Sequence, residues 1–247
     1  MKIDAVEAAD YTLPFSKPFY FGNQKLTTKQ GYLLILTGGE NTGVGEISIF
    51  EEFGTPGLNT IRDMLPGVAD FVMHRDSTDI MSDLGNTSAL FHPIINAAIE
   101  QAVFSLLCAE YNTDISGLIN LPYKKSVPVN AVLSGIDSDE LLLTGRTQYE
   151  QGYRTLKLKL TADNNQENVK NIDLLLNQFD NSVKLRLDAN GTWSKQRAEE
   201  FFRSTAGYPV EYIEQPVANP KDFPALKNIC TYPIAADESV LNSDVCK

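Results

Sequence analysis

The part of the sequence that decides the fold contains four short apolar segments. They are TLKLKL (155–160), VKLRLDAN (183–190), VEYIEQP (210–216) and YPIAADES (232–239). Each segment is rich in residues that favour β-structure and is bounded by turn or helix-starting residues, so each predicts a buried strand. The intervening segments 166–179, 195–205 and 222–229 have helical patterns. Alternating strands and helices are typical of a parallel α/β architecture.

Two lysines lie on the first of these strands. Lys157 and Lys159 share one face, because side chains alternate along a strand. A lysine on a central strand of a parallel sheet is costly to bury unless it is paired or functional. A lone K-x-K pair also fits a solvated edge, so its meaning depends on the strands that follow.

Each of the next three strands has a carboxylate near its C-terminal end, namely Asp188, Glu214 and Asp237. Their spacing is close to one βα unit of roughly 30 residues. The C-terminal ends of successive strands in a parallel barrel meet at one mouth, where such enzymes keep their chemistry. One such acid alone is more often a helix cap or a loop residue. Three acids beside two lysines predict a site for a hard divalent cation with a base nearby.

The N-terminal half predicts an α+β unit of antiparallel strands followed by helices. We expect a strand over 2–13, a loop over 14–23, a hairpin over 31–50 around GGENT, and helices over 58–73 and 93–111. The boundary is expected within LINLPYKKS (118–126), after which VPVNAVLS begins the alternating part with a helix over 138–151. We therefore predict two domains, 1–120 and 121–247.

Composition excludes several classes of protein. A net charge of −11 argues against binding to nucleic acid or to an anionic membrane. There is no apolar run of about 18 residues and no secretory signal at the start. The three cysteines form no C-x-x-C pair, which fits reduced thiols in a cytoplasm. His74 and His92 lie away from the strand ends, so neither a zinc cage nor a histidine base is expected. We expect a cytoplasmic protein; the sequence assigns no oligomeric state.

These motifs resemble those of the enolase superfamily, within its muconate-lactonizing-enzyme-like subgroup. The matching motifs are K-x-K at 157–159, DAN at 188–190, EQP at 214–216, DES at 237–239 and GVGEIS at 43–48. The resemblance implies an α/β fold in which an N-terminal α+β capping domain precedes a TIM-like (β/α) barrel. RLDAN, IEQP and VPVNA are most similar to the o-succinylbenzoate synthases of menaquinone biosynthesis.

The resemblance also implies a small-molecule carboxylate substrate and a chemistry. The chemistry is the removal of a proton α to the carboxylate, with Mg²⁺, or alternatively Mn²⁺, stabilising the resulting charge. It assigns metal binding to Asp188, Glu214 and Asp237, and the role of general base to Lys159. Lys157 is expected to bind and polarise the anion.

Two more residues and two segments are expected near the substrate. Asn190 is predicted to be a neighbour of the metal or the substrate. Arg186 is predicted to contact the substrate or orient the ligands, with the alternative that it is an ion-pair partner for a buried acid. Segments 15–23 and 50–54 are expected to cover the mouth and shape specificity.

Three functions remain open from the sequence. The first is a hydro-lyase in which Lys159 takes a proton from 2-succinyl-6-hydroxy-2,4-cyclohexadiene-1-carboxylate and returns it to the departing hydroxyl, giving o-succinylbenzoate and water. The second is a dipeptide epimerase or N-acylamino acid racemase, in which a second lysine returns the proton. The third is a non-catalytic metal-binding or interaction fragment.

The sequence departs from the family pattern at its end. The family has another catalytic lysine on the strand after the third ligand, and Lys247 comes too early to be that residue. Only about five barrel strands are expected, too few for a closed barrel. The chain is therefore predicted to be a C-terminally truncated fragment, inactive alone, or else a naturally shortened relative.

Overall fold

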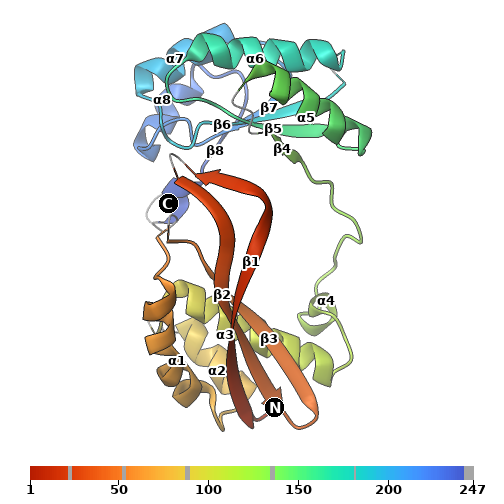
Figure 1. The fold of residues 1–247 in the computed structure, drawn as a ribbon, viewed down its shortest axis with the longest axis vertical. Helices are drawn as coiled ribbons and strands as arrows, with labels where there is room; N and C mark the ends of the chain where they lie inside the picture. The colour runs from red at the N-terminus through yellow and green to blue at the C-terminus, as the bar shows by residue number, and fades with distance from the viewer. Residues whose placement is uncertain (22–23, 52–53, 87–89, 134–136, 181, 242–247) are drawn as a thin grey trace. The chain divides into compact units, whose positions relative to one another are not determined.

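The chain divides into two compact units, Met1–Lys124 and Lys125–Lys247. The structure is a computed structural model that describes residues 1–21, 24–51, 54–86, 90–133, 137–180 and 182–241. Each unit has its own sheet (Figure 1). Each unit also has its own hydrophobic core. Among the described residues, every helix is too short or too polar to cross a membrane.

The N-terminal unit is an antiparallel sheet covered by helices, as the sequence predicted. Its strands are β1 (Ala5–Phe21), β2 (Gln24–Gly38) and β3 (Asn41–Ile49), in the spatial order β1-β2-β3. Its helices are α1 (Leu58–Val72), α2 (Ser77–Asn86), α3 (Pro93–Glu110) and the short α4 (Ile115–Leu118). Leu34, Leu36 and Ile47 are fully or almost fully buried in a core with α1, α2 and α3.

One prediction for this unit was wrong, and one helix was not predicted. The expected loop over 14–23 is strand as far as Phe21, and residues 22–23 lie outside the described part of the chain. Pro14 and Pro18 are tolerated because β1 is an edge strand, where a missing N–H need not break the ladder, and the register shifts between Pro14 and Phe19. Helix α2 was not predicted at all, because its apolar signal rests chiefly on Ile80 and Leu84.

Helix α3 lies very close to strand β3, and two glycines make this approach possible. A Cβ added to Gly43 would overlap the carbonyl oxygen of Ala102, and one added to Gly45 would overlap that of Ala98. Because backbone atoms of a helix cannot move aside as a flexible side chain can, both positions require glycine. The GVG part of the family motif is therefore a packing device in this fold.

The second unit is a five-stranded parallel sheet with helices between successive strands. In spatial order the strands are β4 (Ala131–Leu133), β5 (Thr155–Lys159), β6 (Lys184–Asp188), β7 (Val210–Glu214) and β8 (Ile234–Ala235). The helices are α5 (Ser138–Glu150), α6 (Asn165–Gln178), α7 (Lys195–Ser204) and α8 (Phe223–Lys227), with 3₁₀ turns η2 (Pro220–Asp222) and η3 (Glu238–Leu241). The predicted partial TIM-like (β/α) barrel, preceded by an α+β unit, is confirmed.

Three of these helices begin at a residue whose side chain caps the first turn. Asp137, Asn164 and Ser194 accept hydrogen bonds from the backbone N–H three residues later. Such caps satisfy an N–H group that has no partner within the helix. The caps fix where each strand-to-helix loop ends, and these loops surround the C-terminal edge of the sheet.

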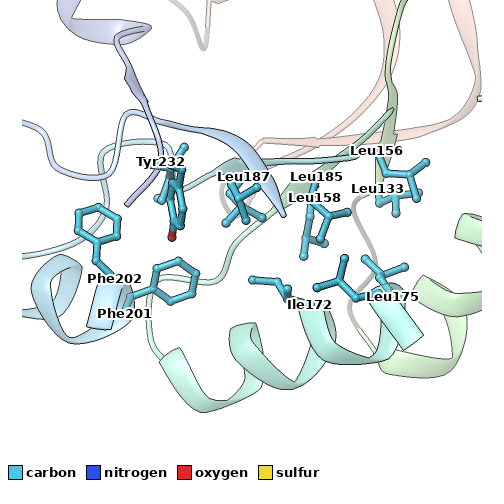
Figure 2. Packing of buried hydrophobic residues seen from close by; sticks show 14 of the residues in the cluster. Leu133, Leu156, Leu158, Ile172, Leu175, Leu185, Leu187, Phe201, Phe202 and Tyr232 are labelled. Atoms are coloured by element: carbon cyan, nitrogen blue, oxygen red, sulfur yellow. The ribbon is translucent and has the colours of Figure 1, made fainter. Parts of the chain in front are cut away.

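One face of the parallel sheet packs on its helices. Figure 2 shows Leu156, Leu158, Leu185 and Leu187 of the strands facing Ile172 and Leu175 of α6 and Phe201 and Phe202 of α7. Because side chains alternate along a strand, the residues between these leucines project from the opposite face. That face carries Lys157, Lys159, Arg186 and Asp188. The apolar core thereby determines where the charged residues lie.

Candidate active site

Strand register brings three of the predicted site residues to the same level. Lys159 is paired with Asp188 across β5 and β6, and Asp188 is paired with Glu214 across β6 and β7. Ala235 of β8 is paired with Glu214, so Asp237 lies two residues further along. Parallel strands with this register present their C-terminal side chains at one edge of the sheet.

Lys157 lies between two of the predicted metal ligands. Its Nζ is 3.0 Å from Oδ2 of Asp188 and lies 2.8 and 2.9 Å from the two carboxylate oxygens of Glu214. Asp188 is buried, and Glu214 is largely buried. The ammonium group therefore bridges carboxylates from two neighbouring strands, and it does so with charge-assisted hydrogen bonds.

The charges of this cluster shift the pKa values of its members. Burial lowers the pKa of Lys157, but hydrogen bonds from its ammonium to Glu214 and Asp188 outweigh burial and raise that pKa. Burial raises the pKa of Glu214, and the hydrogen bond from Lys157 only partly offsets it because Asp188 and Asp237 add negative charge. The carboxylates that raise the pKa of Lys157 also contribute, after burial, to the raised pKa of Glu214, and a further cation would offset their negative charge.

Lys159 is held next to the bridged pair. Its Nζ donates to Oδ1 of Asn190 at 3.0 Å and is 3.7 Å from Oδ2 of Asp188. The Asn190 amide nitrogen donates to Glu238 at 3.2 Å, and the Asn190 backbone N–H donates to Asp188 at 3.0 Å. The Lys159 side chain is 37% exposed, so a small molecule can reach its amine while neighbouring side chains keep it in place.

Asp237 is placed on the next strand end but is exposed. Its backbone N–H donates to the side-chain oxygen of Gln215 at 2.8 Å, and its charge acts on Glu214. Across the described ranges, the structure holds no group of three or more acidic, histidine or cysteine side chains in a metal-binding arrangement. It brings Asp188 and Glu214 together around Lys157, and Asp237 lies outside that pair.

The donors nevertheless fit a hard divalent cation. Carboxylate oxygens are the ligands that Mg²⁺ prefers, and Mg²⁺ is usually bound through one or two carboxylates together with water or substrate oxygens. Two carboxylates already close enough to share one ammonium group satisfy that requirement. The excess negative charge of the cluster favours a cation at the same place.

Arg186 has partners away from the acids at the strand ends. Its Nε is 2.7 Å from Oε2 of Glu211, and its Nη1 donates to Oδ1 of Asn130 at 2.7 Å. The guanidinium also lies over the ring of Tyr212, 5.2 Å from its centroid. The alternative expected from the sequence was an ion pair with a buried acid; Arg186 does form an ion pair, but its partner Glu211 is 35% exposed. A substrate contact by Arg186 stays a prediction.

Gln215 was not singled out from the sequence as a functional residue. It is 1% exposed, directly follows Glu214 and has a φ of +39°. The signal in the sequence is a polar amide between a strand-end acid and a proline, a place where a buried amide must find hydrogen-bond partners. Those partners lie on the segment that carries Asp237.

Comparisons with known proteins fit this geometry. Residues 143–247 match the family described as enolase C-terminal domain-like. The L-Ala-D/L-Glu epimerase of Bacillus subtilis is 25% identical over 97% of this chain and 68% of that protein. The o-succinylbenzoate synthase of Thermobifida fusca is 27% identical over 50% of this chain and 38% of that protein.

A solved structure matches the fold over nearly the whole chain. The dipeptide epimerase from Cytophaga hutchinsonii, complexed with Mg and the dipeptide D-Ala-L-Val, superposes with a TM-score of 0.87 and 22% identity, over 99% of this chain and 68% of that one. The expected resemblance is confirmed: residues 143–247 match the enolase C-terminal domain-like family, and the fold of the chain is similar to that of a dipeptide epimerase and of a muconate lactonizing enzyme.

Proposed function

We propose that this protein is a divalent-metal-dependent enzyme that removes a proton α to a carboxylate, with Lys159 as the base. The observation that carries the proposal is the strand register, which pairs Lys159 with Asp188 and Asp188 with Glu214 at the ends of three neighbouring strands. It places an accessible amine beside two carboxylates that already share a cation, Lys157. Abstraction of so weakly acidic a proton needs both a positioned base and positive charge near the developing anion.

Asp188, Glu214 and Asp237 are the residues that would hold the metal, Mg²⁺ or alternatively Mn²⁺. When bound, the metal would supply Lewis-acid stabilisation of the negative charge that develops on the substrate. Lys157 keeps Asp188 and Glu214 close together and contributes positive charge of its own. Its position at the bridge also supports the expected role in binding the substrate anion.

Lys159 would take the α-proton at Nζ. A general base must reach hydrogen-bond distance of the proton that it removes, and the partial exposure of Lys159 permits that approach. Asn190 accepts from the same nitrogen and so limits the directions in which the amine can point. Asn190 would thus orient the base beside the substrate.

For the substrate, we propose first the dehydration that forms o-succinylbenzoate from 2-succinyl-6-hydroxy-2,4-cyclohexadiene-1-carboxylate, a step of menaquinone biosynthesis. Its support is the set of motifs RLDAN, IEQP and VPVNA, together with the similarity to the Thermobifida fusca synthase over half of this chain. In this reaction the proton taken by Lys159 leaves with the hydroxyl group as water.

The second candidate is epimerisation of a dipeptide or racemisation of an N-acylamino acid. The specific observation in its favour is coverage, because the Bacillus subtilis epimerase matches over 97% of this chain. Both candidates begin with the same proton abstraction. They differ in whether a hydroxyl group departs or the proton returns to carbon.

The decisive experiment measures proton abstraction directly. The full-length protein is incubated with Mg²⁺ in D₂O with the cyclohexadiene carboxylate or with an L-Ala-L-Glu dipeptide. ¹H NMR follows loss of the α-proton signal, dehydration and epimerisation. Lys159→Ala is expected to lower the rate by about 10²- to 10⁴-fold. Lys170→Ala, an exposed lysine on α6, serves as the control.

The possible results separate the candidates. Dehydration without epimerisation supports the synthase, and epimerisation without dehydration supports the second candidate. If Lys159→Ala removes the α-proton as fast as the unaltered protein does, Lys159 is not the base. Absence of turnover and α-exchange with both substrates would argue for the non-catalytic alternative.

A further inference from the structure

Gln215 is a buried amide at the junction of three strand ends. It directly follows Glu214, the last residue of β7, and is 1% exposed. Its φ of +39° is uncommon for a residue other than glycine. A long polar side chain in such a place must satisfy its hydrogen-bonding groups inside the protein.

The side-chain oxygen of Gln215 finds its partners on the segment that follows β8, and the side-chain nitrogen finds its partner just after β7. Its Oε1 accepts from the backbone N–H of Asp237 at 2.8 Å, and from the hydroxyl and backbone N–H of Ser239 at 2.9 and 3.4 Å. Its Nε2 donates to the carbonyl oxygen of Val217 at 3.0 Å, which fixes the orientation of the amide.

The backbone of Gln215 makes bonds to both neighbouring strands. Its N–H donates to the carbonyl oxygen of Ala235 in β8 at 2.9 Å. Its carbonyl oxygen accepts from the N–H of Gly191, which follows Asn190, at 2.6 Å. One buried residue therefore connects the chain after β6, where Asn190 lies, with the chain around β8.

The sheet itself gives Asp237 little support. Strand β8 has only two residues, Ile234–Ala235, and its pairing with β7 ends at Ala235, opposite Glu214. The bond from the Asp237 N–H to Gln215 is therefore a contact beyond the ladder that ties this residue to the neighbouring strand end.

From these contacts, we infer that Gln215 is a positioning residue that sets the place of Asp237 relative to Asp188 and Glu214. The inference rests on the proposed metal site and deepens it. Gln215 itself has no role as a ligand here. Its amide would determine whether the third carboxylate is available to a cation held by the other two.

The test is divalent-metal affinity, measured with Mn²⁺ by the electron paramagnetic resonance of the free ion. Gln215→Met keeps the length of the side chain but removes the acceptor and the donor. Because loss of a residue that orients metal ligands typically weakens affinity 10- to 100-fold, we expect a rise in the Mn²⁺ dissociation constant of roughly that size. Asp188→Asn, which alters a proposed ligand, should abolish most binding.

Gln178→Met is the matched control for a general loss of stability. Gln178 is another glutamine of this unit and is partly buried. Its amide donates to the carbonyl oxygen of Leu142 at 3.1 Å, between α6 and α5. Gln178→Met is expected to leave Mn²⁺ affinity within about twofold of the unaltered protein, since ordinary substitutions at distant sites act independently.

A second readout does not depend on metal. Amide hydrogen exchange should show that the N–H of Asp237 loses protection in Gln215→Met and keeps it in Gln178→Met. If Gln215→Met does not fold, the variant Ser239→Ala tests the same contact. It removes one of the three donors to the Gln215 oxygen, so it should weaken Mn²⁺ binding by a smaller factor, and unchanged binding would overturn the inference.

The outcomes distinguish the inference from the function beneath it. If the unaltered protein binds no Mn²⁺, the proposed metal site and the inference both fail. If the unaltered protein binds Mn²⁺ and folded Gln215→Met binds it equally well, the inference alone fails. Weaker binding in Gln215→Met, with normal binding in Gln178→Met, supports it.

Discussion

Nζ of Lys159 and Oδ1 of Asn190 are 3.0 Å apart, across the ends of two adjacent parallel strands. Asn190 has a φ of +47°, a conformation that asparagine and aspartate tolerate better than most residues. Its amide nitrogen faces Glu238 at the same time. The oxygen of Asn190 is thus directed toward the proposed base.

Replacement of Asn190 by aspartate tests this relationship while preserving shape and backbone conformation. The added carboxylate would form an ion pair with the amine of Lys159 and so compete with the substrate for it. We expect the rate of α-proton exchange at pH 7 to fall by roughly tenfold or more. ¹H NMR of α-proton loss in D₂O measures the rate, and an unchanged rate would contradict the proposed contact.

Removal of the bridging ammonium should destabilise the metal-free protein. Lys157→Met leaves Asp188 and Glu214 adjacent without a counter-charge, and we expect a loss of roughly 2 kcal/mol in the free energy of unfolding. This figure is below that for a fully buried pair because the side chain of Lys157 is 19% exposed. Urea denaturation measures the change.

The same variant gives a test of where the metal binds. A divalent cation can replace the missing positive charge, so saturating Mg²⁺ should stabilise Lys157→Met more than it stabilises the unaltered protein. Lys170→Met, on the surface of α6, is the control. Equal stabilisation of all three proteins by Mg²⁺ would show that the ion does not bind between Asp188 and Glu214.

Gly45 offers a prediction about the first unit. In Gly45→Ala the new methyl group would overlap the Ala98 carbonyl of α3, and we expect a destabilisation of about 3 kcal/mol from the forced separation of helix and sheet. Gly85→Ala is the control, because an added Cβ there meets nothing within 4 Å. Since Gly85 is in helix α2, its replacement by alanine should stabilise by up to about 1 kcal/mol.

The thiol of Cys230 should react slowly with alkylating reagents at neutral pH. Burial raises its pKa to about 11, and only the thiolate reacts. Because a raised pKa delays deprotonation, the alkylation rate should rise about tenfold per pH unit from pH 8 to 10 and level off near pH 11. Mass spectrometry of the Cys230 peptide after iodoacetamide treatment measures this rate, and a plateau below pH 9 would contradict the prediction.

The architecture of the second unit was readable from the sequence because two patterns agree. Apolar and charged residues alternate within the strands, and strands alternate with helices along the chain. Leucines alternate with charged residues in TLKLK and KLRLD, so burial of Leu158 and Leu187 leaves Lys159 and Asp188 on the other face. The strands and most helices of this unit follow from such local patterns. Strands β5 and β6 each have five residues, and the structure pairs Lys159 with Asp188 at their ends.

Long-range contacts account for what the sequence did not indicate. The bridge from Lys157 to Glu214 joins residues 57 positions apart, and the place of Asp237 depends on the side chain of Gln215 rather than on a strand pattern. Pro14 and Pro18 locally favour a loop, but pairing with β2 overrides that preference. Whether segments 15–23 and 50–54 cover the mouth stays a prediction, and 22–23 and 52–53 lie outside the described residues.

The two hydrophobic cores share no residue: one includes Ile3, Ile47 and Leu106, and the other includes Leu133, Phe201 and Leu226. A cavity in one core removes contacts only from the side chains around it. A cavity made in one core should therefore leave the packing of the side chains in the other core unchanged.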